Sequence, residues 1–144
     1  MKFIDEENID FGILLSKNGL SQTSFRKKLI KLFHLSNSSL SIDEVINGLH
    51  NNVDKATVYR ALNAFEKNGL IHKVPDKDNL LRYALCQKEC SPTKHSHNHA
   101  HLLCDKCNST YCLNDFKIPI ENNYNGFIVS NSKIILEGRC VDCQ

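Results

Sequence analysis

The sequence predicts an α+β protein with a helix-rich N-terminal part and a smaller, strand-rich C-terminal part. Apolar residues recur at helical spacing through much of residues 9–65, and two strand-like runs follow before residue 86. All seven cysteines lie within residues 86–144. We therefore expect one unit at residues 1–85, a hinge or linker at 86–95 and a second unit at 96–144.

Three short helices are expected first. Residues 5–17 carry apolar side chains at helical spacing and end just before Gly19, which is a typical stop. Ser24 can cap a second helix, whose apolar positions also follow the helical period. Ser41 and Glu44 have the spacing of a capping box and predict the start of a third helix.

A fourth helix is expected at residues 54–69, with a hairpin after it. Val58, Ala61, Leu62 and Phe65 share one face of this helix. Two strands at residues 70–74 and 80–85 are joined by a polar turn that contains Pro75. Helices followed by a hairpin describe a winged helix, which places a recognition helix in the major groove of DNA.

Basic and polar side chains on these helices are suited to DNA. Five basic residues and no acid lie between Lys17 and Lys31, although a solvated helix face explains such a run equally well. Packing and a surface ion pair are likewise the plain alternatives for Tyr59 and Arg60. Arginine can bind guanine or phosphate through two parallel hydrogen bonds. The expected DNA-binding residues are Arg26, Lys28, Lys55, Thr57, Tyr59 and Arg60.

The second unit has little core of its own. After a polar stretch from Cys86, short strand-like runs occur at residues 100–103, 110–113, 126–130 and 133–136. A helix or helical turn is expected near Pro119 to Tyr124. A unit of about 50 residues buries little apolar surface, so a bound metal ion would supply part of its stability.

Two Cys-x-x-Cys pairs supply the ligands for such an ion. Four thiolates on one tetrahedral metal leave no position open for a substrate, which is typical of structural zinc. A redox pair is the alternative, but it favours a thioredoxin-like βαβ setting that is not evident here. The expected structural zinc ligands are Cys104, Cys107, Cys140 and Cys143.

Composition excludes several classes of protein. No apolar run approaches the roughly 18 residues of a membrane span, and the first residues do not resemble a signal peptide, so we expect a cytoplasmic protein without membrane contact. No His-Glu-x-x-His or Ser/His/Asp pattern occurs, and the histidine cluster contains no acid to act as a base. We expect no enzymatic activity and no small-molecule substrate.

The ordered motifs resemble the ferric uptake regulator family of metal-responsive repressors. The run Ala56-Thr57-Val58-Tyr59-Arg60-Ala61-Leu62 is followed by Gly69-Leu70-Ile71, His99-x-His101-Leu102-Leu103-Cys104-x-x-Cys107 and Gly138-x-Cys140-x-x-Cys143. The resemblance spans roughly residues 20–143. It implies a winged-helix DNA-binding domain, a small zinc-stabilised α+β dimerisation domain with a four-cysteine site, and a regulatory metal site near the hinge.

The resemblance also bears on the sensed metal. Where iron- and peroxide-sensing members have a histidine and an acid, this chain has Ser39 and Ala84; Ala100 and Ser132 likewise stand where many members have Asp and His. The zinc uptake regulators of the family are more similar, because this chain keeps the matching His72, Cys86 and His97 and offers Cys112 where they have an acid. Cys112 is also explained as a buried strand residue. The implied regulatory ligands are drawn from His72, Cys86, His97, His99, His101 and Cys112.

The resulting hypothesis is a homodimeric, zinc-responsive repressor that binds a roughly palindromic double-stranded DNA operator and controls metal-uptake genes. Thiolate with imidazole suits zinc, whereas ferrous sites favour oxygen and nitrogen ligands. Two alternatives on the same fold are an iron or peroxide sensor and a metal-independent repressor with only structural zinc.

Overall fold

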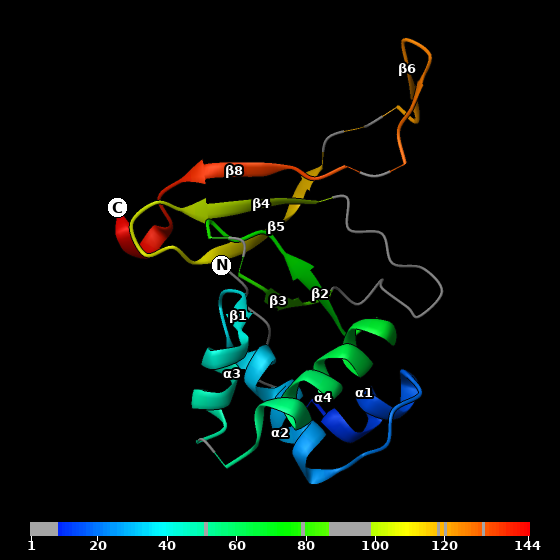
Figure 1. Cartoon of the computed structure of the whole chain (residues 1–144), viewed down its shortest axis with the longest axis vertical. Helices are drawn as coiled ribbons and strands as arrows, with labels where there is room; N and C mark the ends of the chain where they lie inside the picture. The colour runs from blue at the N-terminus through cyan, green and yellow to red at the C-terminus, as the bar shows by residue number, and fades with distance from the viewer. Residues whose placement is uncertain are drawn as a thin grey trace.

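The computed structural model describes residues 9–50, 52–78, 80–86, 99–117, 119, 121–130 and 132–144. Its helices gather at one end of the molecule, and a second group of strands lies at the other, with the strands β2 and β3 between them (Figure 1). The predicted division at residues 86–95 stays a prediction, because all but the first residue of that stretch lie outside the described residues. Among the described residues no helix is long and apolar enough to cross a membrane.

Four helices form the N-terminal part. They are α1 (Phe11–Lys17), α2 (Ser24–Leu35), α3 (Ile42–Gly48) and α4 (Lys55–Lys67). Each begins at a side chain that accepts a backbone N–H bond, and Ser41 with Glu44 forms the predicted capping box. Thr23 rather than Ser24 caps α2, and Ser24 is its first helical residue. Gly69, at φ 79°, adopts the left-handed conformation that ends α4 as predicted.

A three-stranded sheet completes the winged helix. Strand β2 (Ile71–Val74) pairs with β3 (Arg82–Leu85) as the predicted hairpin, and both are antiparallel. A two-residue strand, β1 (Leu40–Ser41), adds to the other edge of β3. Strand β1 was not predicted, because two residues carry no period of their own and become a strand only by pairing.

The main core lies between the helices and this sheet. Leu29, Val58, Leu62, Phe65 and Tyr83 are all fully buried in it. Burying one such side chain contributes about 1.5–3 kcal/mol. Because the apolar residues of α2 and α4 recur at helical spacing, burying them turns the opposite face of each helix toward solvent. In α4, burial of Val58 and Leu62 leaves Tyr59 and Arg60 exposed.

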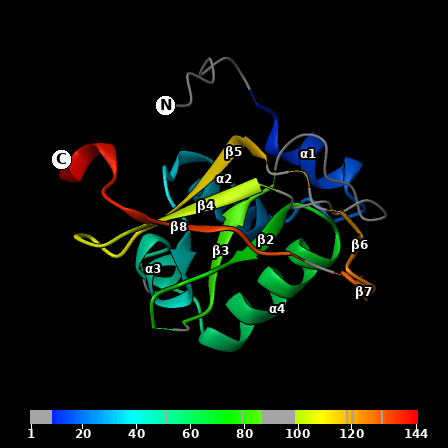
Figure 2. The ribbon, with the colours of Figure 1, turned by 90° about the horizontal axis from the view of Figure 1, so that it is seen from above.

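The second sheet joins strands that are far apart in sequence. Its order is β5-β4-β8, from β5 (Thr110–Lys117), β4 (His99–Cys104) and β8 (Ile135–Gly138). Strand β4 is antiparallel to β5 and parallel to β8. Seen from above, this sheet lies across the wing strands, and the C-terminal turn η1 (Val141–Cys143) lies at the opposite end from the hairpin β6–β7 (Figure 2).

The expected helix near residues 119–124 is wrong. The described residues there form no helix, and β6 (Asn123–Tyr124) pairs with β7 (Phe127–Ile128) as a two-stranded hairpin. Asn125 and Gly126 join them with φ angles of 48° and 84°. Asn-Gly at a two-residue loop is the strongest short hairpin signal, since both residues tolerate positive φ. This turn signal was present in the sequence and is stronger than the pattern that suggested a helix.

Polar contacts connect the two parts of the molecule. The Ser39 N–H donates to the carbonyl of Thr110 on β5 at 2.9 Å, and the Thr110 hydroxyl donates to the carbonyl of Pro75 at 2.8 Å. Both Ser39 and Thr110 are buried. The end of the wing strand β2 and the start of β5 therefore lie together.

Candidate metal centres and DNA-binding surface

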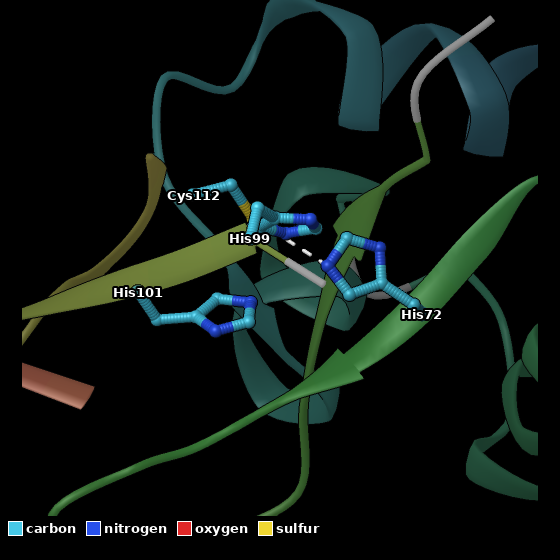
Figure 3. A group of neighbouring side chains, drawn as sticks. All are labelled: His72, His99, His101 and Cys112. Atoms are coloured by element: carbon cyan, nitrogen blue, oxygen red, sulfur yellow. Dashed lines mark hydrogen bonds between the residues drawn. The ribbon is translucent and has the colours of Figure 1, made fainter. Parts of the chain in front are cut away.

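The first candidate site lies at the junction between the wing and the second sheet. His72 comes from β2, His99 and His101 come from β4, and Cys112 comes from β5. One ligand atom from each residue lies within 4.8 Å of the others. The three rings and the thiol point toward one another in Figure 3. We refer to these four residues as the junction cluster.

The local structure explains why these side chains converge. His99 and His101 alternate with Ala100 on β4, so both can face the same side of the sheet, and His101 lies opposite Cys112 in the β4–β5 register. The pairing shifts between His99 and Ala100, which is an irregularity of the bulge type. His72 reaches the same point from β2 (Figure 3).

Burial and distance make the cluster suitable for a metal ion. The three histidines are 4–7% exposed, and their ring centroids lie 4.7–5.8 Å apart. The Cys112 Sγ lies 3.5 Å from Nε2 of His72. Three imidazoles and one thiol, buried within reach of a common centre, match the nitrogen and sulfur donors that tetrahedral zinc takes.

Four of the six expected regulatory ligands form this cluster. Cys86 stands beside it, with Sγ 3.5 Å from Nδ1 of His72, and is not among the four clustered residues. His97 lies outside the described residues. Ala84 lies directly opposite His72 in the wing and has no donor atom on its side chain. Ser39, which stands where iron- and peroxide-sensing members have a histidine, accepts a hydrogen bond from Arg82 through its hydroxyl.

The second candidate site is the four-cysteine group. The Sγ atoms of Cys104, Cys107, Cys140 and Cys143 lie within 4.8 Å of one another. Cys104 ends β4, and the tight turn after it returns Cys107 to the same side. Parallel pairing of β4 with β8 sets Cys104 opposite Gly138, so the chain enters the second Cys-x-x-Cys pair beside the first. The sequence prediction that these four residues meet agrees with this geometry.

Hydrogen bonds favour an anionic Cys104. Backbone N–H groups of Cys107 and Cys140 lower the pKa of the Cys104 thiol to about 6, and the Cys140 N–H lies 3.4 Å from its sulfur. The hydroxyl and N–H of Ser109 lower the pKa of Cys107. The neighbouring Cys140 sulfur raises the pKa of Cys143 to about 12. Four sulfurs so close cannot all be ionised without a cation, and a bound Zn²⁺ would supply it.

The expected DNA-binding residues lie on α2 and α4, and most are exposed. Lys28, Lys55, Tyr59 and Arg60 face solvent, whereas Arg26 and Thr57 are half-buried. Some of them contact other side chains of the protein: Lys55 pairs with Asp43 at 3.3 Å, and Arg60 donates to the Thr57 hydroxyl at 3.3 Å. Such exposed contacts are weak and compatible with phosphate or base contact.

One buried polar residue of the wing, Arg82 on β3, was not singled out from the sequence. Arg82, 7% exposed, donates to the hydroxyl and carbonyl of Ser39 at 2.9 and 2.8 Å. The same guanidinium lies 2.8 Å from Glu44 and 3.6 Å from Asp76. The only sequence signal was a charged residue within an otherwise apolar wing strand.

Comparisons with known proteins agree with this architecture. The profile of the Ferric uptake regulator family matches residues 17–133. The peroxide-responsive repressor PerR of Staphylococcus saprophyticus is 26% identical, covering 100% of this chain and 96% of that protein.

Two solved structures share the fold. The ferric uptake regulator of Vibrio cholerae superposes with a TM-score of 0.62 at 20% identity, covering 91% of this chain and 100% of that one. A zinc uptake regulator complexed with zinc and DNA has a TM-score of 0.58 at 18% identity, covering 94% and 95%. Because the family profile matches most of the sequence, the chain belongs to the ferric uptake regulator family of metal-responsive, DNA-binding transcriptional regulators, which are not enzymes.

Proposed function

We propose that this protein is a zinc-responsive repressor that acts in the cytoplasm as a homodimer and controls metal-uptake genes. The observation that carries the proposal is the junction cluster, in which His72 of the wing meets His99, His101 and Cys112 of the second sheet. A thiol among three imidazoles favours zinc over ferrous iron. The absence of a donor on Ala84 supports the same choice.

The arrangement suggests how metal binding changes DNA affinity. When bound, zinc supplies a tetrahedral junction that holds its ligands in fixed directions. His72 belongs to the same sheet as β3, which packs on the helices, whereas the other three ligands belong to the second sheet. Joint ligation by these residues fixes the angle between the wing and the second sheet. DNA affinity then rises only by the difference in zinc affinity between the competent and other angles.

DNA recognition is assigned to the exposed side of α4, with further contacts from α2. Arg60 and Tyr59 are suited to base edges or phosphates, and Lys55, Thr57, Arg26 and Lys28 to the backbone. A two-fold symmetric dimer presents two such helices to the two halves of a palindrome. Cys104, Cys107, Cys140 and Cys143 are assigned to a structural zinc that stabilises the second sheet.

A second candidate is a sensor of peroxide on the same fold. It is favoured by the PerR relative, whose similarity extends over the whole of this chain. Metal preference separates the two: a peroxide sensor of this kind requires a redox-active metal at the junction cluster, whereas zinc has no redox chemistry with which to oxidise its histidine ligands.

The test compares His72→Asn with His50→Asn, an exposed histidine outside both candidate sites. DNA is selected from a random library with zinc-loaded protein, and binding is then measured during zinc titration after mild chelation. We expect zinc to tighten DNA binding by wild type and His50→Asn, and not by His72→Asn, with the dimer and the tightly held zinc unchanged. A full zinc response in His72→Asn contradicts the proposal, and a response to ferrous iron alone favours the second candidate.

A further inference from the structure

We infer that Cys86 is a positioning residue for His72 and that Cys112 is the sole thiolate ligand within the junction cluster. In this assignment Cys86 accepts a hydrogen bond from Nδ1–H of His72, so that Nε2 is left to bind metal. The inference rests on the proposed function, and it deepens it by separating two cysteines that the sequence treats alike.

The two sulfurs lie on opposite sides of one ring. The Cys112 Sγ is 3.5 Å from Nε2 of His72, and the Cys86 Sγ is 3.5 Å from Nδ1. The two nitrogens of an imidazole point away from each other, so one nitrogen at a time faces a given ion. Figure 3 shows that the nitrogen beside Cys112 is also turned toward His99 and His101. Cys86 therefore contacts the side of the ring that is turned away from this group.

The backbone holds Cys86 and His72 as one unit. The Cys86 N–H donates to the carbonyl of Leu70 at 2.8 Å, which continues the pairing of β2 with β3 beyond Leu85. Residues 84 and 86 alternate onto one face of that sheet, and Ala84 is the cross-strand partner of His72. Cys86 thus moves with His72 whatever the angle of the wing, and among the residues that the structure describes, Cys112, His99 and His101 approach His72 from the second sheet.

The chemistry of ligating histidines requires such a partner. A metal-bound imidazole normally donates its other ring N–H to an acceptor, which fixes both tautomer and orientation. Sulfur is a weak acceptor as a thiol and a better one as a thiolate. The opposite tautomer would put the proton on Nε2 of His72, facing Cys112, and would remove that nitrogen from the ligand set. Cys86 therefore acts on the metal through the ring of His72.

Cobalt substitution tests the assignment, because each cobalt–thiolate bond adds charge-transfer absorption in the near ultraviolet. Protein that retains zinc in the four-cysteine group is emptied of exchangeable metal and titrated with Co²⁺. We expect Cys112→Ala to lose this absorption at the second site. Cys86→Ala should keep the full absorption per bound cobalt but bind cobalt and zinc about 10–100-fold more weakly.

The variant Cys86→Ser serves as the conservative control, because its hydroxyl still accepts a hydrogen bond and should restore part of the affinity. A Cys86→Ala protein with about half the charge-transfer absorption would make Cys86 a ligand and overturn the inference. Unchanged affinity together with unchanged absorption also overturns it. If wild type binds no second cobalt at all, the proposed function itself fails, and this result is distinct from either outcome with the variants.

Discussion

Replacing Arg82 with alanine should destabilise the winged helix more than any exposed charge change. The guanidinium lies between the Asp76 carboxylate, 5% exposed, and the buried Ser39, and it also bonds Glu44 of the capping box on α3. Removing one partner of a buried pair costs about 3–5 kcal/mol, because the remaining charge loses its compensation. Stability of a domain is about 5–15 kcal/mol, so the change takes a large share of it.

The assay is urea denaturation of the zinc-loaded protein followed by circular dichroism at the helical minimum. This signal reports the N-terminal part, since all four α-helices of the described residues lie there. Lys55→Ala is the matched control, because it breaks the exposed Lys55–Asp43 pair, which is worth less than about 1 kcal/mol. If Arg82→Ala costs no more than Lys55→Ala, the guanidinium does not hold Ser39, Glu44 and Asp76 together in solution and the reasoning is refuted.

Three further predictions concern the other sites. Cys104→Ser should lose the tightly bound zinc and lower the thermal stability of the second sheet, measured by metal content and calorimetry, because metal-binding energy there is folding energy. Arg60→Ala should weaken operator binding by about 1–3 kcal/mol without changing the helical signal, measured by fluorescence anisotropy. Phe127→Ser should weaken the homodimer in sedimentation velocity, because Phe127 is 71% exposed on an apolar hairpin that a second chain would cover.

The first two of these predictions have a matched control. Ser109→Ala beside the cysteines should keep its zinc, and a Cys104→Ser protein with full zinc content would contradict the structural assignment. Glu66→Ala on α4 should bind DNA at least as well as wild type; equal losses in Glu66→Ala and Arg60→Ala would point to general damage to α4. A dimer unaffected by Phe127→Ser would move the interface away from the hairpin.

The helices and wing strands could be predicted because their signals are local. Capping residues, helical spacing and the Gly69 stop act within a few residues of one another, and the hydrophobic face of α4 determines which of its residues are exposed. Strand β1 could not be found in this way. Its two residues form a strand only because β3 lies beside them, and β3 is more than forty residues away in sequence. The hairpin β6–β7 was predictable from Asn125-Gly126, and the turn signal was overlooked.

The candidate sites divide along the same line. The spacing of the two Cys-x-x-Cys pairs was enough to predict that the four cysteines lie together in one candidate metal site. For the junction cluster, the sequence offered histidines and cysteines as candidate ligands, but it could not separate Cys86 from Cys112. That distinction depends on which nitrogen of His72 each sulfur faces, which is fixed by tertiary packing. The buried Arg82 was missed because a charged residue within an apolar strand does not by itself show that its side chain is internal.

Strand β4 carries His99 and His101 near its start and Cys104 at its end. At a rise of about 3.3 Å per residue, His101 and Cys104 are roughly 10 Å apart along the strand. An ion held by the four-cysteine group, as proposed, would fasten this strand to β8, and the two histidines would then keep their alignment only while those sulfurs hold it. Metal loading should therefore be sequential: the four-cysteine group binds a tightly held ion first, and the junction cluster binds an exchangeable ion second. An oxidant that attacks the four thiolates would abolish the zinc response without reaching a single residue of the junction cluster.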